Sequence, residues 1–347
     1  MNNPVIIGNA TLYLGDAMTV LATLPDCSVN CCVTSPPYWG LRDYGTAGQL
    51  GLESTTAEYV EKMVAVFREV RRVLRDDGTL WLNLGDSYFS TSKGSGGPSD
   101  KQERNAGSWY EPRKFAAPGD GIKTKDLVGI PWRVAFALQA DGWYLRQDII
   151  WSKPNPMPES VTDRCTKAHE YIFLLAKSER YYFDAKAIQE PFSDASIARL
   201  EQPNLEQQAG SDRVPGKTNG AMKACGPSSY RGSTFTRGKT GAVKPTVGQG
   251  ERVEAAGRNK RSVWTVTTQP YKEAHFATFP PKLIEPCILA GAPAGGVILD
   301  PFNGSGTTGL VALQHGRAYI GIELNPDYLA MTMPRIENAQ RQERLLY

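Results

Sequence analysis

A serine, two prolines and an aromatic residue follow one another at the end of an apolar run, as Ser35-Pro36-Pro37-Tyr38. Proline fixes φ and has no backbone N–H, so the pair stops a strand and stiffens the turn after it. The Ser35 hydroxyl and the Pro36 carbonyl can accept hydrogen bonds, and Tyr38 offers a flat ring for stacking. Two acceptors aimed at the N–H bonds of an aromatic amine would free the nitrogen lone pair for reaction. A rigid surface turn without a ligand is the alternative for so short a motif.

A second candidate site is the glycine-rich segment from Asp300 to Gly309, which follows an apolar run. Glycine lets the backbone approach a ligand closely, and the helix expected after it begins with unpaired N–H groups. Glu323 ends the next apolar run, where a carboxylate can accept hydrogen bonds from both hydroxyls of a ribose. This pattern is typical of a site for a nucleoside-containing cofactor.

The glycine spacing also fits another cofactor. Gly304, Gly306 and Gly309, with Glu323 further on, match the fingerprint of dinucleotide-binding sheets, which would indicate an NAD-dependent oxidoreductase. Too few residues follow Gly309 to complete such a sheet, so its other strands must come from the N-terminal half. A P-loop does not fit, because no lysine follows the glycines. A glycine-rich turn with no ligand is the remaining alternative.

Together, the two motifs resemble the signatures of the amino-group DNA methyltransferases, which methylate N4 of cytosine or N6 of adenine. Ser35 to Tyr38 matches the catalytic signature (Asp/Asn/Ser)-Pro-Pro-(Tyr/Phe). Asp300 to Thr308 matches the cofactor signature Asp-Pro-Phe-x-Gly-x-Gly-Thr-Thr. The catalytic signature comes first, as in the family's beta arrangement, in which the target-recognition region lies between the motifs.

The resemblance covers about residues 10–185 and 263–330 and includes weaker matches. Gly15-Asp16 is similar to the segment that meets the cofactor's adenine, and Phe279–Leu283 to one near its methionine moiety. Trp151–Pro154 is similar to a strand end near the flipped base. The residues that the family pattern assigns to the cofactor, S-adenosylmethionine, are Asp16, Thr34, Lys282, Asp300, Phe302, Gly304, Gly306, Thr307 and Glu323.

The resemblance implies a Rossmann-like α/β fold, with a mostly parallel sheet and helices on both faces. The strand ending at Thr34 should lie beside the strand ending at Asp300, across a topological switch point. The implied reaction is direct displacement on a base flipped out of the duplex, without a covalent enzyme intermediate.

The catalytic residues in this reading are Ser35, Pro36, Pro37 and Tyr38. Ser35 favours N4 of cytosine as the target, since many adenine enzymes of the family carry Asp or Asn there. N6 of adenine stays open as the alternative, because a hydroxyl and a carboxylate can each accept from an amino group.

A second dipeptide in the sequence suggests a different reaction. Pro286-Cys287 is similar to the nucleophile dipeptide of carbon-5 cytosine methyltransferases. It precedes the cofactor motif, however, and shares helical spacing with Leu283 and Ile288, which favours a buried core cysteine. A DNA-binding protein without catalysis would not need both motifs intact. No metal site is expected, because the six cysteines include no Cys-x-x-Cys pair.

Strand and helix patterns alternate on both sides of an irregular middle. The capping box Thr55-x-x-Glu58 starts a helix that Gly78 is expected to end. The other helices are expected at 17–24, 127–140, 307–315 and from about Pro326. Strands are expected at 11–14, 29–34, 79–84, 144–151, 170–176, 181–184, 297–300 and 318–323.

Basic charge is concentrated in one segment. The net charge of the 347 residues is only +3, but residues 213–261 contain eleven Lys or Arg and two acids. We therefore expect residues 186–262 to grip DNA and read its sequence, with a solvated disordered loop as the alternative. The basic residues expected to contact DNA are Arg213, Lys217, Lys223, Arg231, Arg237, Lys239 and Lys244.

These patterns predict a catalytic domain of residues 1–185 and 263–347, interrupted by a target-recognition region at 186–262. Residues 90–125, rich in Gly, Ser, Lys and Pro, are expected to form a mobile loop. The expected partner is double-stranded DNA, with a cognate restriction enzyme and a second copy of the chain as further candidates. No apolar run could span a bilayer and the start of the chain shows no secretory signal, so a cytoplasmic protein is expected.

Overall fold

The computed structural model describes residues 3–41, 45–89, 121–193, 197–198, 257–269 and 278–344. Chain contacts divide the protein into two units, Met1–Ala187 with Arg261–Tyr347, and Ile188–Lys260. In the smaller unit, Glu190 forms a β-bridge and an ion pair with Arg258. The seven predicted DNA contacts, and residues 90–120 of the predicted mobile loop, lie outside the described residues.

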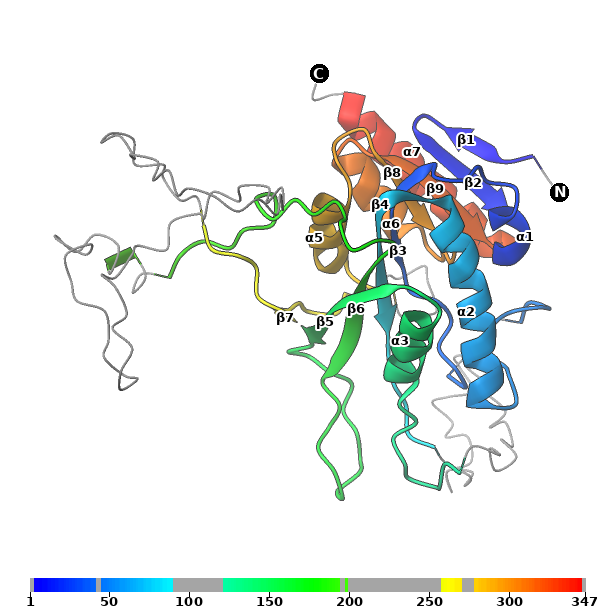
Figure 1. Ribbon diagram of the computed structural model, residues 1–347, viewed down its shortest axis with the longest axis vertical. Helices are drawn as coiled ribbons and strands as arrows, with labels where there is room; N and C mark the ends of the chain where they lie inside the picture. Colours follow the sequence, from blue (N-terminus) through cyan, green and yellow to red (C-terminus); the bar gives the residue numbers. More distant parts are fainter. Residues whose placement is uncertain are drawn as a thin grey trace, which may run out of the picture. The chain divides into compact units, whose positions relative to one another are not determined.

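The larger unit is built on one nine-stranded sheet (Figure 1). Across the sheet, the strands are β1 (Val5–Ile7), β2 (Ala10–Leu14), β9 (Ala318–Glu323), β8 (Val297–Asp300), β3 (Val29–Thr34), β4 (Leu74–Leu84), β6 (His169–Ala176), β5 (Tyr144–Ser152) and β7 (Val263–Thr265). From β2 to β4, neighbouring strands are all parallel. Antiparallel pairs flank them, since β6 runs opposite to β4 and β5, and β1 opposite to β2.

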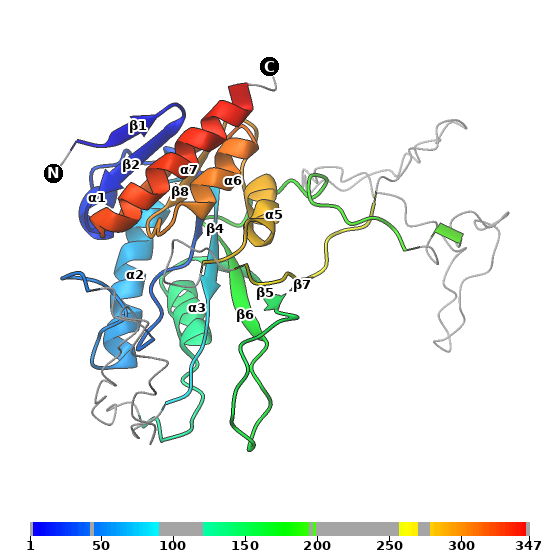
Figure 2. The ribbon, with the colours of Figure 1, turned by 180° about the vertical axis from the view of Figure 1, so that it is seen from behind.

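Helices cover both faces of the sheet, as expected. On one face lie α1 (Ala17–Leu21), α2 (Thr56–Val73) and α3 (Ile130–Ala140), of which α2 and α3 stand in front in Figure 1. On the other face lie α5 (Pro281–Gly291), α6 (Thr307–Gln314) and α7 (Pro326–Arg344), seen in front in Figure 2. No helix in the described part of the chain is long and apolar enough to cross a membrane.

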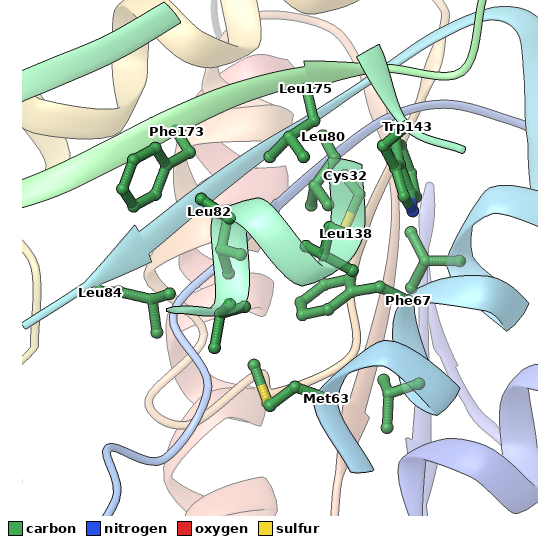
Figure 3. Packing of buried hydrophobic residues seen from close by; sticks show 14 of the residues in the cluster. Cys32, Met63, Phe67, Leu80, Leu82, Leu84, Leu138, Trp143, Phe173 and Leu175 are labelled. Atoms are coloured by element: carbon green, nitrogen blue, oxygen red, sulfur yellow. The ribbon is translucent and has the colours of Figure 1, made fainter. Parts of the chain in front are cut away.

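The main core lies between the sheet and the helices α2 and α3 (Figure 3). Met63 and Phe67 of α2 and Leu138 of α3 pack on Leu82 of β4. Burying such side chains contributes about 2 kcal/mol each, which fixes the helices on the sheet. Cys32 of β3 belongs to the same core, where burial and nearby acidic groups raise the pKa of its thiol. The cysteine is therefore an inert part of the core.

The start of α2 is where the sequence predicts it, but its end is not. Thr55 Oγ1 accepts from the Glu58 backbone N–H at 3.1 Å, as in a capping box. The expected stop at Gly78 is wrong, because α2 ends at Val73 and Gly78 lies inside β4. Leu74 is fully buried and pairs with Val29 of β3, so sheet pairing takes over directly after the helix.

The expected strand at 181–184 is also absent from the described structure. Its backbone makes single hydrogen bonds to separate segments, from Tyr182 N to Asp77 O and from Asp184 N to Ala290 O. These bonds form no ladder with a neighbouring strand.

Candidate active site

The two motifs meet at the carboxyl ends of neighbouring parallel strands. β3 and β8 pair directly, with Cys31 opposite Ile298 and Cys32 opposite Leu299. From β3 the chain passes through α2 to β4, whereas from β8 it passes through α6 to β9 on the other side. The two connections diverge here and leave a crevice, so this is the topological switch point. The expectation that these strands are neighbours is confirmed.

A cavity of about 1000 Å³ opens at this point in the larger unit. Such a volume can hold a cofactor and part of a substrate together. The sequence-predicted residues that line it are Asp16, Ser35, Pro36, Pro37, Tyr38, Asp300, Phe302, Gly304, Thr307 and Glu323. The structure therefore brings most of both motifs into one site.

Asp300 anchors the glycine-rich loop to β3. Its Oδ1 accepts from Thr34 Oγ1 at 2.6 Å and from Phe302 N at 3.0 Å, and its Oδ2 accepts from Thr308 Oγ1 at 2.7 Å. Burial raises the pKa of the Asp300 carboxyl to about 6, although these three donors favour the charged form. The carboxyl group thus fixes the loop where it leaves β8, and this explains the buried position of Thr34 behind the cavity wall.

Glu323 joins the end of β9 to the same loop. Its Oε2 accepts from Gly304 N at 2.7 Å and its Oε1 from Asn325 N at 2.8 Å. Burial, with a smaller contribution from Asp300, raises the pKa of the Glu323 carboxyl to about 7. Each carboxylate oxygen has a further lone pair that can accept from a ligand.

Two of the other predicted cofactor residues do not line the cavity. Gly306 begins α6 with φ +75°, and a Cβ there would lie 2.5 Å from Thr332 of α7, so this glycine serves close helix packing. Lys282 is exposed in the first turn of α5 and lies off the cavity wall, which Phe279 lines instead. Asp16 does reach the wall, and it also caps α1 by accepting from Thr19 N at 3.0 Å.

The Ser35–Tyr38 turn is held by its neighbours on several sides. The Pro37 carbonyl accepts from the Tyr59 hydroxyl of α2 at 2.8 Å. The Tyr38 ring lies against Gly85, where an added Cβ would be 2.5 Å from a ring carbon. The Tyr38 hydroxyl lies 3.4 Å from Ser35 Oγ. The turn is therefore built rigidly around the position of Ser35.

Sequence reasoning missed two polar residues of this site, Asn83 and Glu170, and noted Lys153 only within a weak family match. All three line the cavity, and Tyr38 hydrogen-bonds to both Asn83 and Glu170. Asn83 carried a signal, since a polar residue inside the apolar strand β4 requires a partner. Glu170 is near the start of β6. In an all-parallel sheet, the start of a strand would lie at the edge opposite to the carboxyl ends of β3 and β8. Because β6 is antiparallel, its start meets the end of β4 instead.

Comparison with known proteins decides the family. The sequence model of the N6/N4 methyltransferases, described as DNA methylases, matches residues 29–334. Type II methyltransferase M.Cfr9I of Citrobacter freundii is 43% identical over 339 residues, covering 97% of this chain and 90% of that protein. The chain belongs to the N6/N4 DNA methylase family. This methyltransferase is also 44% identical over 334 residues to M.XycI of Xanthomonas campestris pv. cyanopsidis, covering 96% and 90% of the two proteins.

Solved structures share the fold of this DNA methyltransferase. PvuII DNA methyltransferase (cytosine-N4-specific) has a TM-score of 0.56 at 18% identity, with 97% of this chain and 93% of that chain covered. A DNA modification methylase candidate from Thermus thermophilus, solved with S-adenosyl-L-methionine, has a TM-score of 0.52 at 22% identity and 95% coverage of each chain.

Cys287 of the methyltransferase is fully buried in α5, with Sγ 3.8 Å from Leu283 O, as expected for a core cysteine.

Proposed function

We propose that this methyltransferase transfers the methyl group of S-adenosylmethionine to N4 of cytosine in duplex DNA. The observation that carries the proposal is the shared cavity, in which the Ser35–Tyr38 turn and the glycine-rich loop after β8 meet at the switch point. One motif is suited to an aromatic amine and the other to a nucleoside cofactor. Their proximity allows direct transfer between the two ligands.

The cofactor side of the cavity fits S-adenosylmethionine. Gly304 has φ +53° and no side chain, so the loop backbone is open to a ligand. The Glu323 carboxylate, at the end of β9, suits the two hydroxyls of a ribose. Phe302 lines the same wall and offers apolar contact. When bound, S-adenosylmethionine supplies a methyl group on a positively charged sulfur.

The substrate side of the cavity suits the exocyclic amine of a flipped base. Ser35 Oγ and the Pro36 carbonyl accept hydrogen bonds from its two N–H groups, and Tyr38 supplies a face on which the base stacks. Drawing the nitrogen toward tetrahedral geometry frees its lone pair for in-line attack. Positioning supplies most of the rate enhancement, and the amine loses its proton after methylation.

Cytosine is the favoured base, and adenine N6 is the second candidate. Ser35 stands where many adenine enzymes of the family have Asp or Asn. The PvuII enzyme is described as cytosine-N4-specific, and a direct sequence alignment, as distinct from the structural one, gives 25% identity over 348 residues, which supports the same choice.

The test is to digest methylated DNA to nucleosides and identify the product by mass spectrometry. N4-methylcytosine is expected, and N6-methyladenine would overturn the base but keep the chemistry. 5-Methylcytosine would overturn both and return attention to Cys287. The Ser35→Ala variant should lose most activity while its affinity for S-adenosylmethionine, measured by calorimetry, is kept.

The remaining functions belong to the same proposal. Residues 186–262 are proposed to hold the DNA and read its sequence, with the basic side chains binding phosphates. A cognate restriction enzyme is a proposed partner, since the relatives are type II methyltransferases. A homodimer and a cytoplasmic location remain predictions from the sequence. Sequencing DNA from cells that express the protein, with modified-base detection, gives the recognition site and the base together.

A further inference from the structure

A chain of polar side chains leads away from Ser35 along the wall of the cavity. Ser35 Oγ lies 3.4 Å from the Tyr38 hydroxyl, and this hydroxyl lies 2.8 Å from Glu170 Oε2. The other oxygen, Glu170 Oε1, forms an ion pair with Lys153 Nζ. The side chains of Lys153 and Glu170 are 18% and 17% exposed, so the pair is mostly withdrawn from water.

The chemistry of its neighbours sets the direction of the Tyr38 hydroxyl. An ionised carboxylate only accepts hydrogen bonds, so Glu170 requires Tyr38 to donate. Asn83 Oδ1, at 3.1 Å, is a second acceptor for the same hydrogen. The Asn83 amide is fixed in this orientation, because its Nδ2 donates to Tyr171 O at 3.0 Å. The Tyr38 hydrogen therefore points away from Ser35.

This direction is passed on to Ser35. With the Tyr38 hydrogen engaged elsewhere, the Tyr38 oxygen accepts from the Ser35 hydroxyl. The Ser35 hydrogen is then drawn out of the cavity, and the lone pairs of its oxygen stay available to the N–H of the target amine. In the reverse direction, Tyr38 would donate to one of these lone pairs. The Ser35 hydrogen would then point toward the target amine, whose N–H groups are also donors.

We propose that Glu170 is a positioning residue, held by Lys153, that orients the Ser35 hydroxyl through Tyr38 so that it accepts from the target amine. The inference rests on the proposed function and adds to it a residue outside both signature motifs. It also gives a role to the tyrosine hydroxyl, because phenylalanine would satisfy the family signature and stack equally well.

A double-mutant cycle on the full chain tests this path. Tyr38→Phe keeps the ring but removes the link, and Glu170→Gln presents an amide N–H to Tyr38 because Lys153 claims the amide oxygen. The readout is the single-turnover rate of methyl transfer to DNA at saturating S-adenosylmethionine. Losing a hydrogen bond to a charged group should slow each variant about tenfold. The double variant should be no slower than Tyr38→Phe alone, because Glu170 acts through Tyr38.

The controls separate positioning from folding. Glu285→Gln, which alters a 2.9 Å hydrogen-bond contact with His315 away from the cavity, should keep the wild-type rate. Glu170→Gln should keep the wild-type affinity for S-adenosylmethionine. An unchanged rate in Glu170→Gln, or a double variant slowed about 100-fold, would overturn the inference.

Failure of the proposed function is recognised separately. A wild-type protein that transfers no methyl group to a DNA amine would overturn both conclusions before any variant is compared. N6-methyladenine as the product would change the proposed base only, because either base presents an amine to Ser35.

Discussion

Replacing Glu323 by glutamine should change how stability depends on pH. The side chain is 8% exposed, and burial raises the pKa of its carboxyl from 4.5 to about 7. Between these values the folded protein holds a proton that the unfolded chain has released, so the contribution of Glu323 to stability falls as pH rises. The fall amounts to about 3 kcal/mol and is complete above about pH 7.

The variant lacks this titration, so its curve should be flatter by the same amount. It should also carry a constant penalty of about 1–2 kcal/mol, because Gly304 N and Asn325 N donate to different oxygens of Glu323 and glutamine keeps only one of these acceptors. Asp300 titrates in the same range in both proteins, so its own contribution largely cancels in the difference, and only its small repulsion of the Glu323 carboxylate is lost in the variant.

Urea unfolding, followed by tryptophan fluorescence from pH 4.5 to about pH 8, measures the effect. Relative to Glu323→Gln, the wild type should lose about 3 kcal/mol of unfolding free energy across this window. Glu61→Gln, on the exposed side of α2, is the control for the substitution itself and should keep the shape of the wild-type curve. Parallel curves for wild type and Glu323→Gln would refute the reasoning.

Three further outcomes are expected. Gly304→Val should abolish S-adenosylmethionine binding in calorimetry, whereas Gly316→Val, which has a similar positive φ but open space around it, should bind normally; equal losses would mean that strain alone is responsible. Cys287→Ser should keep its methyl-transfer rate, and inactivity with intact cofactor binding would support a nucleophilic cysteine. Neutralising basic residues within 213–261 should weaken DNA binding and lower the slope of log affinity against log salt by roughly one per lost phosphate contact, with cofactor affinity as the control. Specific methylation by a chain that lacks most of this segment would contradict the recognition role.

The motifs and the central strands could be predicted from the sequence because they depend on local patterns. The apolar run at Val29–Thr34 and the run at Val297–Asp300 have the bounds that the structure gives to β3 and β8. The pairing of these strands followed from the resemblance, which required both motifs at one site. The turn chemistry of Ser35–Tyr38 was equally local, since the prolines fix it.

The other parts of the site depend on tertiary pairing, which local patterns do not carry. The reversal of β6 brings Glu170 to the active edge, and only the neighbours in the sheet determine that reversal. The end of α2 depends on the burial of Leu74 against β3 rather than on Gly78. Lys282 was assigned by family position, but its side chain is exposed in the first turn of α5 and does not line the cavity.

The order of the strands also has a consequence for the synthesis of the chain. β9 and β8 lie between β2 and β3, although they are made long after both. Until residues 297–323 have left the ribosome, β2 and β3 each have an open edge facing a gap in the unfinished sheet. Open edges pair readily with other chains, so a product that terminates early should aggregate. Such a product also lacks the loop after β8 that lines the cofactor side of the cavity. Only a chain completed past β9 can therefore methylate DNA.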